Sequence, residues 1–430
     1  MISWKRSFYF VWFAEFMAIS GFATTTPIIP LYLRTLGVTD PARLNFWNGL
    51  AQSTSALALA VFAPIWGRVA DGYGRKPMLV RAMFGGAILV SLLSLTTAPW
   101  QVVVLRALQG CVTGTVAAAT VLVASMVPRE ETGYRLGLLQ MGIFLGNSVG
   151  PLFGGMLVDA AGPHVNFLAT GAILALSGVL VLRLVREDFV PSPKSGSLSH
   201  RIIPDFSPLA KNPALIALLF VTFTVQFASD VAVPILPLVV LHQSGTDQGV
   251  GTMSGLIIGV GALASAFSAA AVGKVSRRIG YGRTLLICVG GCMVFYVLQG
   301  IATTPRGLLW MRVGACIFLG GTMPSVNALI AQLCDPRKQG STYGLSSSVS
   351  NGGAALGPAV GALVATAAGY SAVFFTTAAI LLVTGISVIR SAAHGISFDA
   401  GPSDAEAPNG AARPDGEDPG LRPEAAKGEP

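Results

Sequence analysis

The stretch GRVADGYGRKPML, from Gly67 to Leu79, combines a carboxylate, three cations and three glycines between two runs that almost entirely lack charge. The chain around it is 430 residues long, 52% hydrophobic and only 11% charged, with a mean hydropathy of +0.66. So much apolar surface cannot be hidden in one water-soluble core. The sequence therefore predicts that this stretch is a polar loop between segments that cross a lipid bilayer.

Apolar runs of about 20 residues, enough to cross a hydrocarbon layer roughly 30 Å thick, recur along the chain. Several contain Gly or Pro, which membrane helices tolerate where neighbours satisfy the freed backbone groups. None shows the short alternating pattern of membrane β-strands. We therefore expect an all-α polytopic membrane protein. Its twelve predicted spans are 8–33, 46–66, 78–98, 100–126, 135–160, 165–183, 213–241, 250–273, 283–303, 305–333, 340–368 and 369–391.

Lysine and arginine are distributed unequally between the two sets of loops. The loops on the side of the N-terminus hold twenty of them, whereas the opposite loops hold Arg34, Arg43 and Arg306. Because cytoplasmic loops carry such an excess, both termini are predicted to be cytoplasmic, in a multi-pass protein of the cell inner (plasma) membrane. The net charge of +8 then reflects topology and contact with the lipid bilayer, and no nucleic-acid partner is needed to explain it.

Two segments depart from the pattern of apolar spans and tight loops. Residues 184–212 are polar and rich in Pro and Ser, which predicts a cytoplasmic linker. Residues 392–430 are acidic and rich in Pro, Gly and Ala, so we expect a disordered cytoplasmic tail. The remaining chain forms a predicted N-terminal six-helix bundle over 1–183 and a C-terminal six-helix bundle over 213–391.

Sequence landmarks recur at a constant spacing in the two predicted bundles. The members of each pair are 206 or 207 residues apart, which is hard to produce by chance. Such a repeat is typical of transporters whose two parallel bundles rock about a central site. The pairs are Gly67–Leu79 with Gly273–Leu285 (GKVSRRIGYGRTL), Arg106 with Arg312, Gly150-Pro151 with Gly357-Pro358, and Pro27 and Pro30 with Pro234 and Pro237.

Three motifs resemble those of a known family, the major facilitator superfamily, and within it the twelve-helix drug:proton antiporters. GRVADGYGRKPML is similar to the family's loop 2–3 signature, LRALQGCVTGTVAAA to its helix-four signature, and GNSVGPLFGG to the helix-five signature of antiporters. The run PIIPLYLRTLGV is also similar to multidrug exporters. The resemblance covers residues 1 to about 392. It implies the major facilitator fold, with 12 transmembrane helices in two pseudo-symmetric six-helix bundles.

The loop signature also has a physical interpretation of its own. Gly67 lets the second helix approach a neighbour, and Gly72 and Gly74 allow a sharp reversal of the chain. Asp71 can bind Arg75 or face a helix N-terminus, a contact of about 0.3–2 kcal/mol that can break and reform between two states. The alternative is a turn held only by cations at the membrane surface. The candidate conformational latch, which the resemblance also implies, consists of Gly67, Asp71, Gly74, Arg75 and Lys76.

Small residues gather on one stretch of the predicted fifth helix. They permit close helix contact and bending inside a membrane, and packing alone explains them equally well. The resemblance adds that a bend here keeps an antiporter from leaking at the bundle interface. These residues are Gly146, Gly150, Pro151, Gly154 and Gly155.

Four charged side chains lie deep inside predicted spans, where each costs at least about 2.5 to 3.5 kcal/mol and therefore points to function. At 1.5 Å per residue, Glu15 lies about 10 Å from the cytoplasmic end of its helix, and Asp230 lies near the depth of Arg106 and Arg312. Asp230 can therefore pair with either arginine, whereas we expect Glu15 to sit lower and alone. An isolated carboxylate suits proton coupling or recognition of a cationic substrate. The alternatives are a structural hydrogen bond for Glu15 and a static salt bridge for Asp230.

Helices one, four, seven and ten line the central cavity in the family that the sequence resembles. Most side chains available there are aromatic or apolar, which suits lipophilic small molecules better than sugars. Each of these apolar side chains is equally able to face lipid or a neighbouring helix. The candidate cavity residues are Met17, Phe22, Phe223, Gln226, Phe227 and Asn327, together with Phe13, Phe16 and Met323.

The function that these features predict is proton-coupled export of lipophilic small molecules or drugs by alternating access, carried out by a monomer without a cofactor. No GxxxxGK[ST] phosphate loop occurs, so direct ATP drive is not indicated, and neither an enzyme nor a metal site is expected. One alternative is a proton-coupled nutrient or metabolite symporter of the same fold, which the apolar cavity argues against. Another is a non-transporting receptor or scaffold, which the carboxylates inside spans argue against.

Overall fold

The computed structural model describes residues 4–187, 213–333 and 339–393, and every element within those ranges is helical. The prediction of an all-α protein is therefore confirmed. The predicted linker over 184–212 and the predicted tail over 392–430 lie almost wholly outside the described residues.

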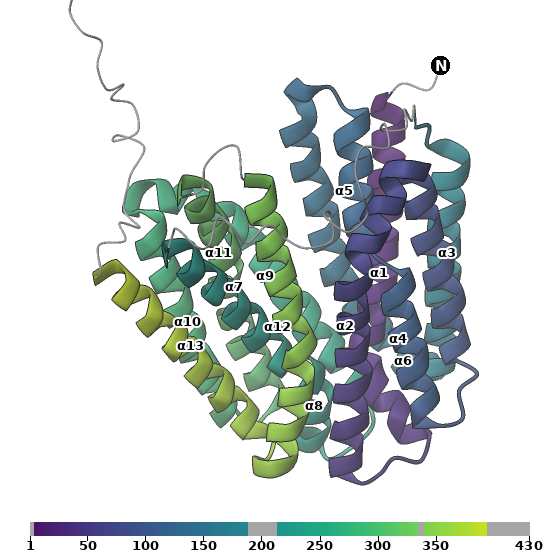
Figure 1. Ribbon diagram of the computed structural model, residues 1–430. Helices are drawn as coiled ribbons and strands as arrows, with labels where there is room; N and C mark the ends of the chain where they lie inside the picture. Colours follow the sequence, from purple (N-terminus) through teal and green to yellow (C-terminus); the bar gives the residue numbers. More distant parts are fainter. Residues whose placement is uncertain (1–3, 188–212, 334–338, 394–430) are drawn as a thin grey trace, which may run out of the picture.

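Two groups of helices lie side by side, one from each half of the chain (Figure 1). The first group consists of α1 (Trp4–Thr35), α2 (Pro41–Tyr73), α3 (Arg75–Leu93), α4 (Pro99–Val112), α5 (Thr115–Met126) and α6 (Arg129–Leu184). The second consists of α7 (Pro213–Ala232), the 3-10 helix η3 (Val233–Ile235), α8 (Leu236–Ser244), α9 (Val250–Ile279), α10 (Tyr281–Ile301), α11 (Pro305–Leu333), α12 (Gln339–Ala368) and α13 (Tyr370–Ala393).

Several predicted spans are not single continuous helices. The range 100–126 is divided between α4 and α5, which meet at Thr113 and Gly114. The range 213–241 is divided among α7, η3 and α8, where Pro234 and Pro237 each remove a backbone donor. Conversely, the ranges 135–160 and 165–183 share α6, which turns at Gly162 with φ 83°.

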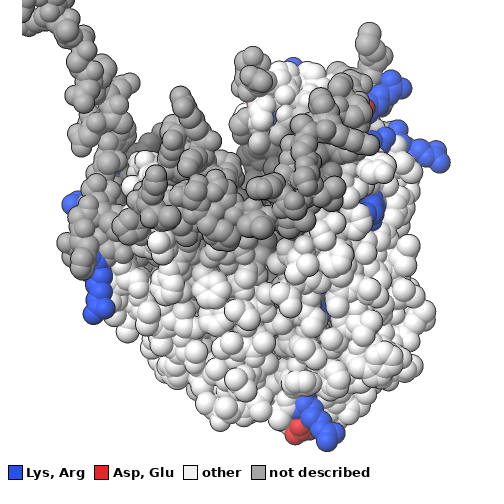
Figure 2. Space-filling view, in the orientation of Figure 1, with Lys and Arg blue, Asp and Glu red and all other residues white. Residues whose placement is uncertain are grey.

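Ten helices of the described chain are long and apolar enough to cross a membrane, judged by length and composition alone. They include Tyr134–Leu184 as one span although it turns at Gly162, and they do not include α12. Figure 2 shows a broad band without charged side chains between the two ends of the molecule. Large apolar side chains such as Leu95, Phe267 and Leu363 are exposed on the surface, as lipid contact requires.

Each group of helices has its own hydrophobic core. Phe8, Tyr32 and Phe167 are fully or almost fully buried in the first core, which draws its side chains mainly from α1 to α6. Tyr296 and Phe374 are buried in the second, which draws on α7 to α13.

Candidate functional site

Glu15 is enclosed within the first group of helices. Its side chain on α1 is 0% exposed, and neither carboxylate oxygen has a hydrogen-bond partner among the described residues. The side chain of Thr115, the first residue of α5, lies close enough to act on the carboxylate. A charged carboxylate without donors is costly by several kcal/mol in such surroundings, so the site suits a proton or a partner that approaches in another conformation.

Arg106 is held by amide side chains rather than by a carboxylate. One guanidinium nitrogen, Nη1, donates to Gln109 Oε1 at 2.9 Å, and Nη2 donates to Gln52 Oε1. Gln52 Nε2 in turn donates to the Thr26 carbonyl at 3.2 Å. Pro30 lacks the amide that would otherwise bond this carbonyl within α1, so the network ties α4 through α2 to the proline-containing part of α1.

Arg312 and Asp230 occupy the corresponding region of the second group. Arg312 Nη1 donates to the Tyr296 hydroxyl at 2.9 Å, and Asp230 Oδ2 accepts from Gln226 Nε2 at 2.7 Å. No ion pair joins Asp230 to Arg106 or Arg312 in the described structure. Gln226, one turn away on the same helix, binds the carboxylate instead.

A carboxylate that follows the last helix of the first group, α6, binds the start of α3, directly after the connection from α2. Glu187 accepts hydrogen bonds from the Arg75 amide at 2.9 Å and the Lys76 amide at 2.8 Å. These amides belong to the first turn of α3 and have no partner within the helix. Gly74, with φ 100°, makes the reversal between the helices and has no side chain with which to cap α3.

The other predicted latch residues behave differently from the sequence expectation. The side chain of Asp71 lies outside the described part of the chain, so its contact remains a prediction. Gly72 belongs to α2, and the sharp reversal occurs at Gly74 alone. No atom of the described residues lies within 4 Å of the position where a Cβ at Gly67 would be, so none of the described helices approaches it in this conformation.

The glycine-rich face of α6 packs closely on α1. A Cβ at Gly150 would meet the Ser20 carbonyl, and one at Gly154 would lie 2.6 Å from Thr24 Cβ. Gly146 faces the same helix. The run GNSVG also fits a nucleophile-elbow pattern, but its serine donates within α6 to the carbonyl four residues earlier and is not on a strand-to-helix turn. The glycine-rich face of α6 therefore serves helix packing.

The same motif also contacts the second group of helices. A Cβ at Gly155 would meet the Gly251 carbonyl of α9, and one at Gly255 of α9 would meet the Pro151 carbonyl. Backbones can approach so closely only where side chains are absent. The predicted antiporter motif is therefore part of the contact between the two halves.

The second half of the chain repeats this arrangement. A Cβ at Gly353 of α12 would lie 2.7 Å from the Phe223 carbonyl, and one at Gly357 would lie 2.8 Å from Asp230 Cβ on α7. Across the halves, a Cβ at Gly49 of α2 would lie 2.6 Å from Ala362 Cβ of α12. The sequence repeat is thus matched by a repeat of helix contacts.

The two halves are joined by polar contacts at the end opposite the N-terminus. Asp159 of α6 accepts from the Gly251 and Thr252 amides of α9, at 3.1 and 2.6 Å. Arg34 and Asp247 form an ion pair. Toward the end that carries the N-terminus, the two groups of helices diverge (Figure 1). The positive-inside distribution of charge predicts that the joined end faces the outside of the membrane, and this end is called the outer end below.

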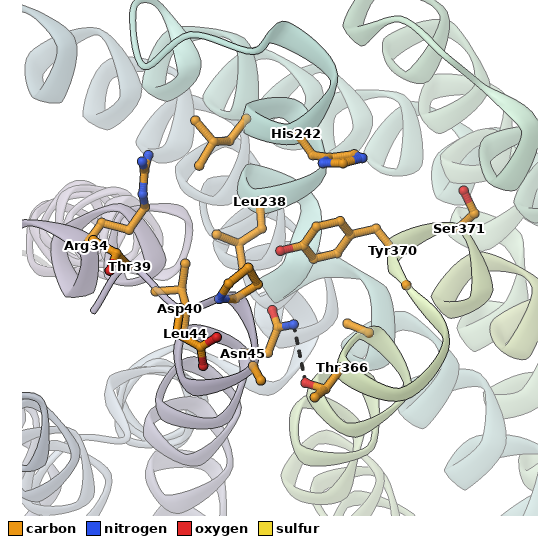
Figure 3. Close-up of a pocket in the computed structure, with 15 residues that line it drawn as sticks. Arg34, Thr39, Asp40, Leu44, Asn45, Leu238, His242, Thr366, Tyr370 and Ser371 are labelled. Atoms are coloured by element: carbon orange, nitrogen blue, oxygen red, sulfur yellow. Dashed lines mark hydrogen bonds between the residues drawn. The ribbon is translucent and has the colours of Figure 1, made fainter. Parts of the chain in front are cut away.

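A hollow of about 660 Å³ opens at this outer junction, lined by parts of α1, α2, α8, α12 and α13. Figure 3 shows Arg34, Asp40, His242 and Tyr370 around it, and Asn45 Nδ2 donates to Thr366 Oγ1 at 3.4 Å across it. A second hollow of similar size shares Arg34 and Thr39 with the first and is otherwise lined mainly by parts of α1 and α6 and by residues 247–249. None of the predicted proton-coupling or cavity residues lines either hollow.

The predicted cavity residues do not share one surface. Phe223 and Phe227 stack on α7 with ring centroids 5.7 Å apart, and Gln226 between them binds Asp230. Phe22 instead points into the first core, where Phe22 Cζ lies 2.6 Å from the position of a Cβ at Gly86. Phe22 therefore packs inside its own group of helices, because Gly86 leaves room for its ring. Met17 is half-buried on α1, and Asn327 is exposed on α11.

Several of these contacts were missed by reasoning from the sequence. Gln52 and Gln109 are amides inside otherwise apolar spans, and that polarity is the signal that could have found them. Tyr296 carries no such signal, because an aromatic residue in a span is ordinary. The apolar pattern gives no sign of the roles of Thr115 and Asp159. Thr115 matters because a helix begins there, and Asp159 matters because it contacts a distant segment.

Comparison with known proteins identifies the protein family and its named relatives. The family model described as Major Facilitator Superfamily matches residues 11–298 and 291–408. The multidrug resistance protein MdtG of Rahnella sp. (strain Y9602) is 36% identical over 384 residues, covering 89% of this chain and 92% of that protein. MdtG of Klebsiella pneumoniae (strain 342) is 34% identical over 388 residues, covering 90% and 93%.

Solved structures resemble the fold. The nucleoside transporter NupG superimposes with a TM-score of 0.73 at 15% identity, covering 88% of this chain and 98% of that one. A bacterial homologue of the lysosomal transporter Spinster, in an inward-facing and unoccupied conformation, gives 0.73 at 15% identity, covering 93% and 99%. At such identities the likeness concerns the fold alone.

Proposed function

Because the chain belongs to the major facilitator superfamily, we propose that it is a proton-coupled exporter of lipophilic small molecules that works by alternating access. It is a multi-pass membrane transporter and not an enzyme. The relatives at 34% to 36% identity are named multidrug resistance proteins, which supports drugs as the substrate class. The excess of cations on the side of the N-terminus supports the inner (plasma) membrane, and we propose that the transporting unit is a monomer.

The observation that carries the proposal is the isolation of Glu15. A buried carboxylate with two unpartnered oxygens must bind a proton or gain a donor, and either event changes the stability of the conformation around it. A proton that crosses the membrane contributes about 2.3 kcal/mol per 100 mV, enough to bias two conformations of similar stability. Protonation of Glu15 on one side and release on the other would therefore drive the cycle.

The contacts between the halves supply the two conformations. The polar and glycine contacts at the outer end hold that end closed, while the inner ends of the helices diverge. Their rupture would let the two groups of helices rock and open the outer side. The stacked rings of Phe223 and Phe227 lie on a helix that contacts α12 and α13, and they offer apolar surface to a lipophilic substrate.

Transport by purified protein in sealed vesicles tests this function. Vesicles with protein inserted in a known orientation are given a proton gradient and a lipophilic fluorescent cation such as ethidium, or a neutral lipophilic antibiotic. An exporter moves the compound opposite to the proton flux, a symporter moves it in the same direction, and a scaffold moves neither. Co-directional flux, or none with any compound of a broad panel, would overturn the proposal.

A further inference from the structure

The fourth predicted membrane segment is interrupted inside the apolar part of the molecule. α4 ends at Val112, Thr113 is extended with φ −81° and ψ −172°, and Gly114 has φ 126°. α5 then begins at Thr115. A Cβ at Gly114 would meet nothing closer than Leu59 Cδ1 at 3.7 Å, so its conformation, and not crowding, requires glycine. Figure 1 shows α5 nearer the end that carries the N-terminus and α4 nearer the other end.

The carbonyl side of this interruption is satisfied by neighbouring side chains. Trp66 Nε1 of α2 donates to the Cys111 carbonyl at 2.6 Å. The Thr113 hydroxyl and amide both donate to the Gln109 carbonyl, at 2.8 and 2.9 Å. Irregular backbone at membrane depth persists only where such partners exist. The interruption is therefore a supported feature of the fold.

The amide side of the interruption has no comparable partner in the part of the chain that the structure describes. The first backbone bond of α5 runs from the Ala118 amide to the Gly114 carbonyl at 3.3 Å, so the amides of Thr115 and the next two residues have no carbonyl within the helix. The first turn of α5 contains no acidic residue. The positive end of the helix dipole is therefore open to an anion.

Glu15 is the anion placed to use this end. α1 packs against α5, Thr115 is buried, and its side chain lies close enough to act on the Glu15 carboxylate. Both carboxylate oxygens nevertheless lack a hydrogen bond of normal geometry, so the Thr115 side chain and the carboxylate lie near each other without being joined. Such an arrangement fits a carboxyl group that is neutral in this conformation and binds the helix end when it ionises.

We propose that the N-terminus of α5, with the Thr115 hydroxyl, is the partner that holds the ionised Glu15, and that Gly114 aims this helix end at it. Thr115 and Gly114 are then positioning residues for proton release. This inference rests on the proposed function, because it assumes that Glu15 exchanges the coupled proton. It adds a place for the ionised carboxylate: when Glu15 loses its proton, the carboxylate moves a short distance and accepts hydrogen bonds from the start of α5.

Charged groups on the surrounding helices do not replace this partner. α5 carries none, and Arg106 of α4 is bound to glutamine side chains. On α6, Arg135 pairs with Glu131, while Asp159 binds the start of α9. Asp40 caps the outer end of α2. Among the described residues, Thr115 is the one whose side chain lies close enough to the Glu15 carboxylate to act on it.

Infrared titration of the full-length protein tests the inference without any substrate. The carbonyl stretch of the protonated Glu15 carboxyl is identified by its loss in Glu15→Gln and followed as the pH rises. In Thr115→Val the hydroxyl donor is gone, so the ionised form is less stable and the midpoint moves up by about half to one pH unit. Thr115→Ser keeps the hydroxyl and restores the wild-type midpoint. Gly114→Ala, which disfavours φ 126°, moves the midpoint in the same direction.

Thr120→Val is the matched control, because its hydroxyl bonds the Val116 carbonyl on the same helix. Equal midpoints for wild type, Thr115→Val and Thr120→Val would overturn the inference and leave the proposed function intact. If wild type shows no Glu15 band at any pH, Glu15 stays ionised and the coupling role fails. The inference then stands only if Thr115→Val makes the band appear. Thr115→Ala replaces Thr115→Val if the latter does not fold.

Discussion

The carboxylate of Asp159, in α6, accepts a 2.6 Å hydrogen bond from the backbone amide of Thr252, in the first turn of α9. Its other oxygen accepts from the Gly251 amide at 3.1 Å. One side chain thus caps a helix of the opposite half at the outer end of the molecule. Helix caps stabilise by about 0.5–2 kcal/mol, and we expect this cap to stabilise only the conformation in which the two halves meet at this end.

Asp159→Ala should therefore raise the ratio of the outward-open to the closed conformation about two- to thirtyfold. Spin labels at Thr97 and Thr303 lie on outer loops of the two halves. Pulsed electron resonance measures the distance between them, and a larger outward-open population gives a larger share of long distances. Asp40→Ala is the control, since Asp40 caps α2 of its own half by accepting from the Arg43 amide. Identical distance distributions for Asp159→Ala and Asp40→Ala would show that the cap does not set the conformation.

Gln52 connects Arg106 to the Thr26 carbonyl of α1. Gln52→Leu keeps the side-chain volume but removes both contacts, leaving Arg106 Nη2 and the Thr26 carbonyl without the partner that they have in the wild type. We expect transport per folded molecule to fall about tenfold. Arg106→Lys should have a similar effect, because lysine lacks the planar fork that reaches two amide oxygens.

Gln101→Leu provides the comparison for Gln52→Leu. Gln101 lies on α4 and accepts from the Thr97 and Ala98 amides at the outer surface. Its replacement should lower the unfolding temperature slightly and leave transport per folded molecule unchanged. Initial rates in vesicles, normalised to folded protein, measure both variants, and equal rates for Gln52→Leu and wild type would remove this network from the mechanism.

Glu187 links the start of the predicted linker to the first turn of α3. Glu187→Gln loses the charge and one strong acceptor, so the Arg75 and Lys76 amides should exchange their hydrogens about two- to thirtyfold faster. Hydrogen exchange with mass spectrometry measures this. Glu131→Gln, which breaks a local pair with Arg135, should not change exchange in that loop. Unchanged exchange in Glu187→Gln would mean that another group caps α3.

Gly150→Ala places a methyl group against the Ser20 carbonyl of α1, where the backbones leave no room. Overpacking of this kind costs about 1–3 kcal/mol, so the thermal unfolding temperature in detergent should drop by several degrees. Gly137→Ala lies on the same helix and meets nothing within 4 Å, so its unfolding temperature should stay near that of wild type. Equal unfolding temperatures for the two variants would contradict the close packing of α6 on α1.

The apolar pattern could predict the fold because lipid sets the length and composition of each span. It could not predict that α4 and α5 are separate helices, since Thr113 and Gly114 interrupt a run that stays apolar on both sides. The reversal at Gly74 was expected, but Gly72 proved to be helical. Local conformation of this kind depends on partners such as Trp66, which come from other segments.

The candidate site was predicted less completely than the fold. Charge inside spans made Glu15, Arg106, Asp230 and Arg312 the candidates, because burial of charge is costly wherever it occurs. Their partners could not be deduced, because the choice between a carboxylate and an amide depends on side-chain reach. Gln226 binds Asp230 from one turn away, so no salt bridge to an arginine forms among the described residues.

Glu15→Gln tests the central claim most directly, because glutamine mimics the protonated acid permanently. In oriented vesicles, the variant should still exchange a lipophilic compound down its own gradient yet fail to accumulate it when a proton gradient is imposed. Asp230→Asn, whose partner Gln226 remains, is measured beside it. Full proton-driven accumulation by Glu15→Gln, with the pH dependence of wild type, would contradict the account.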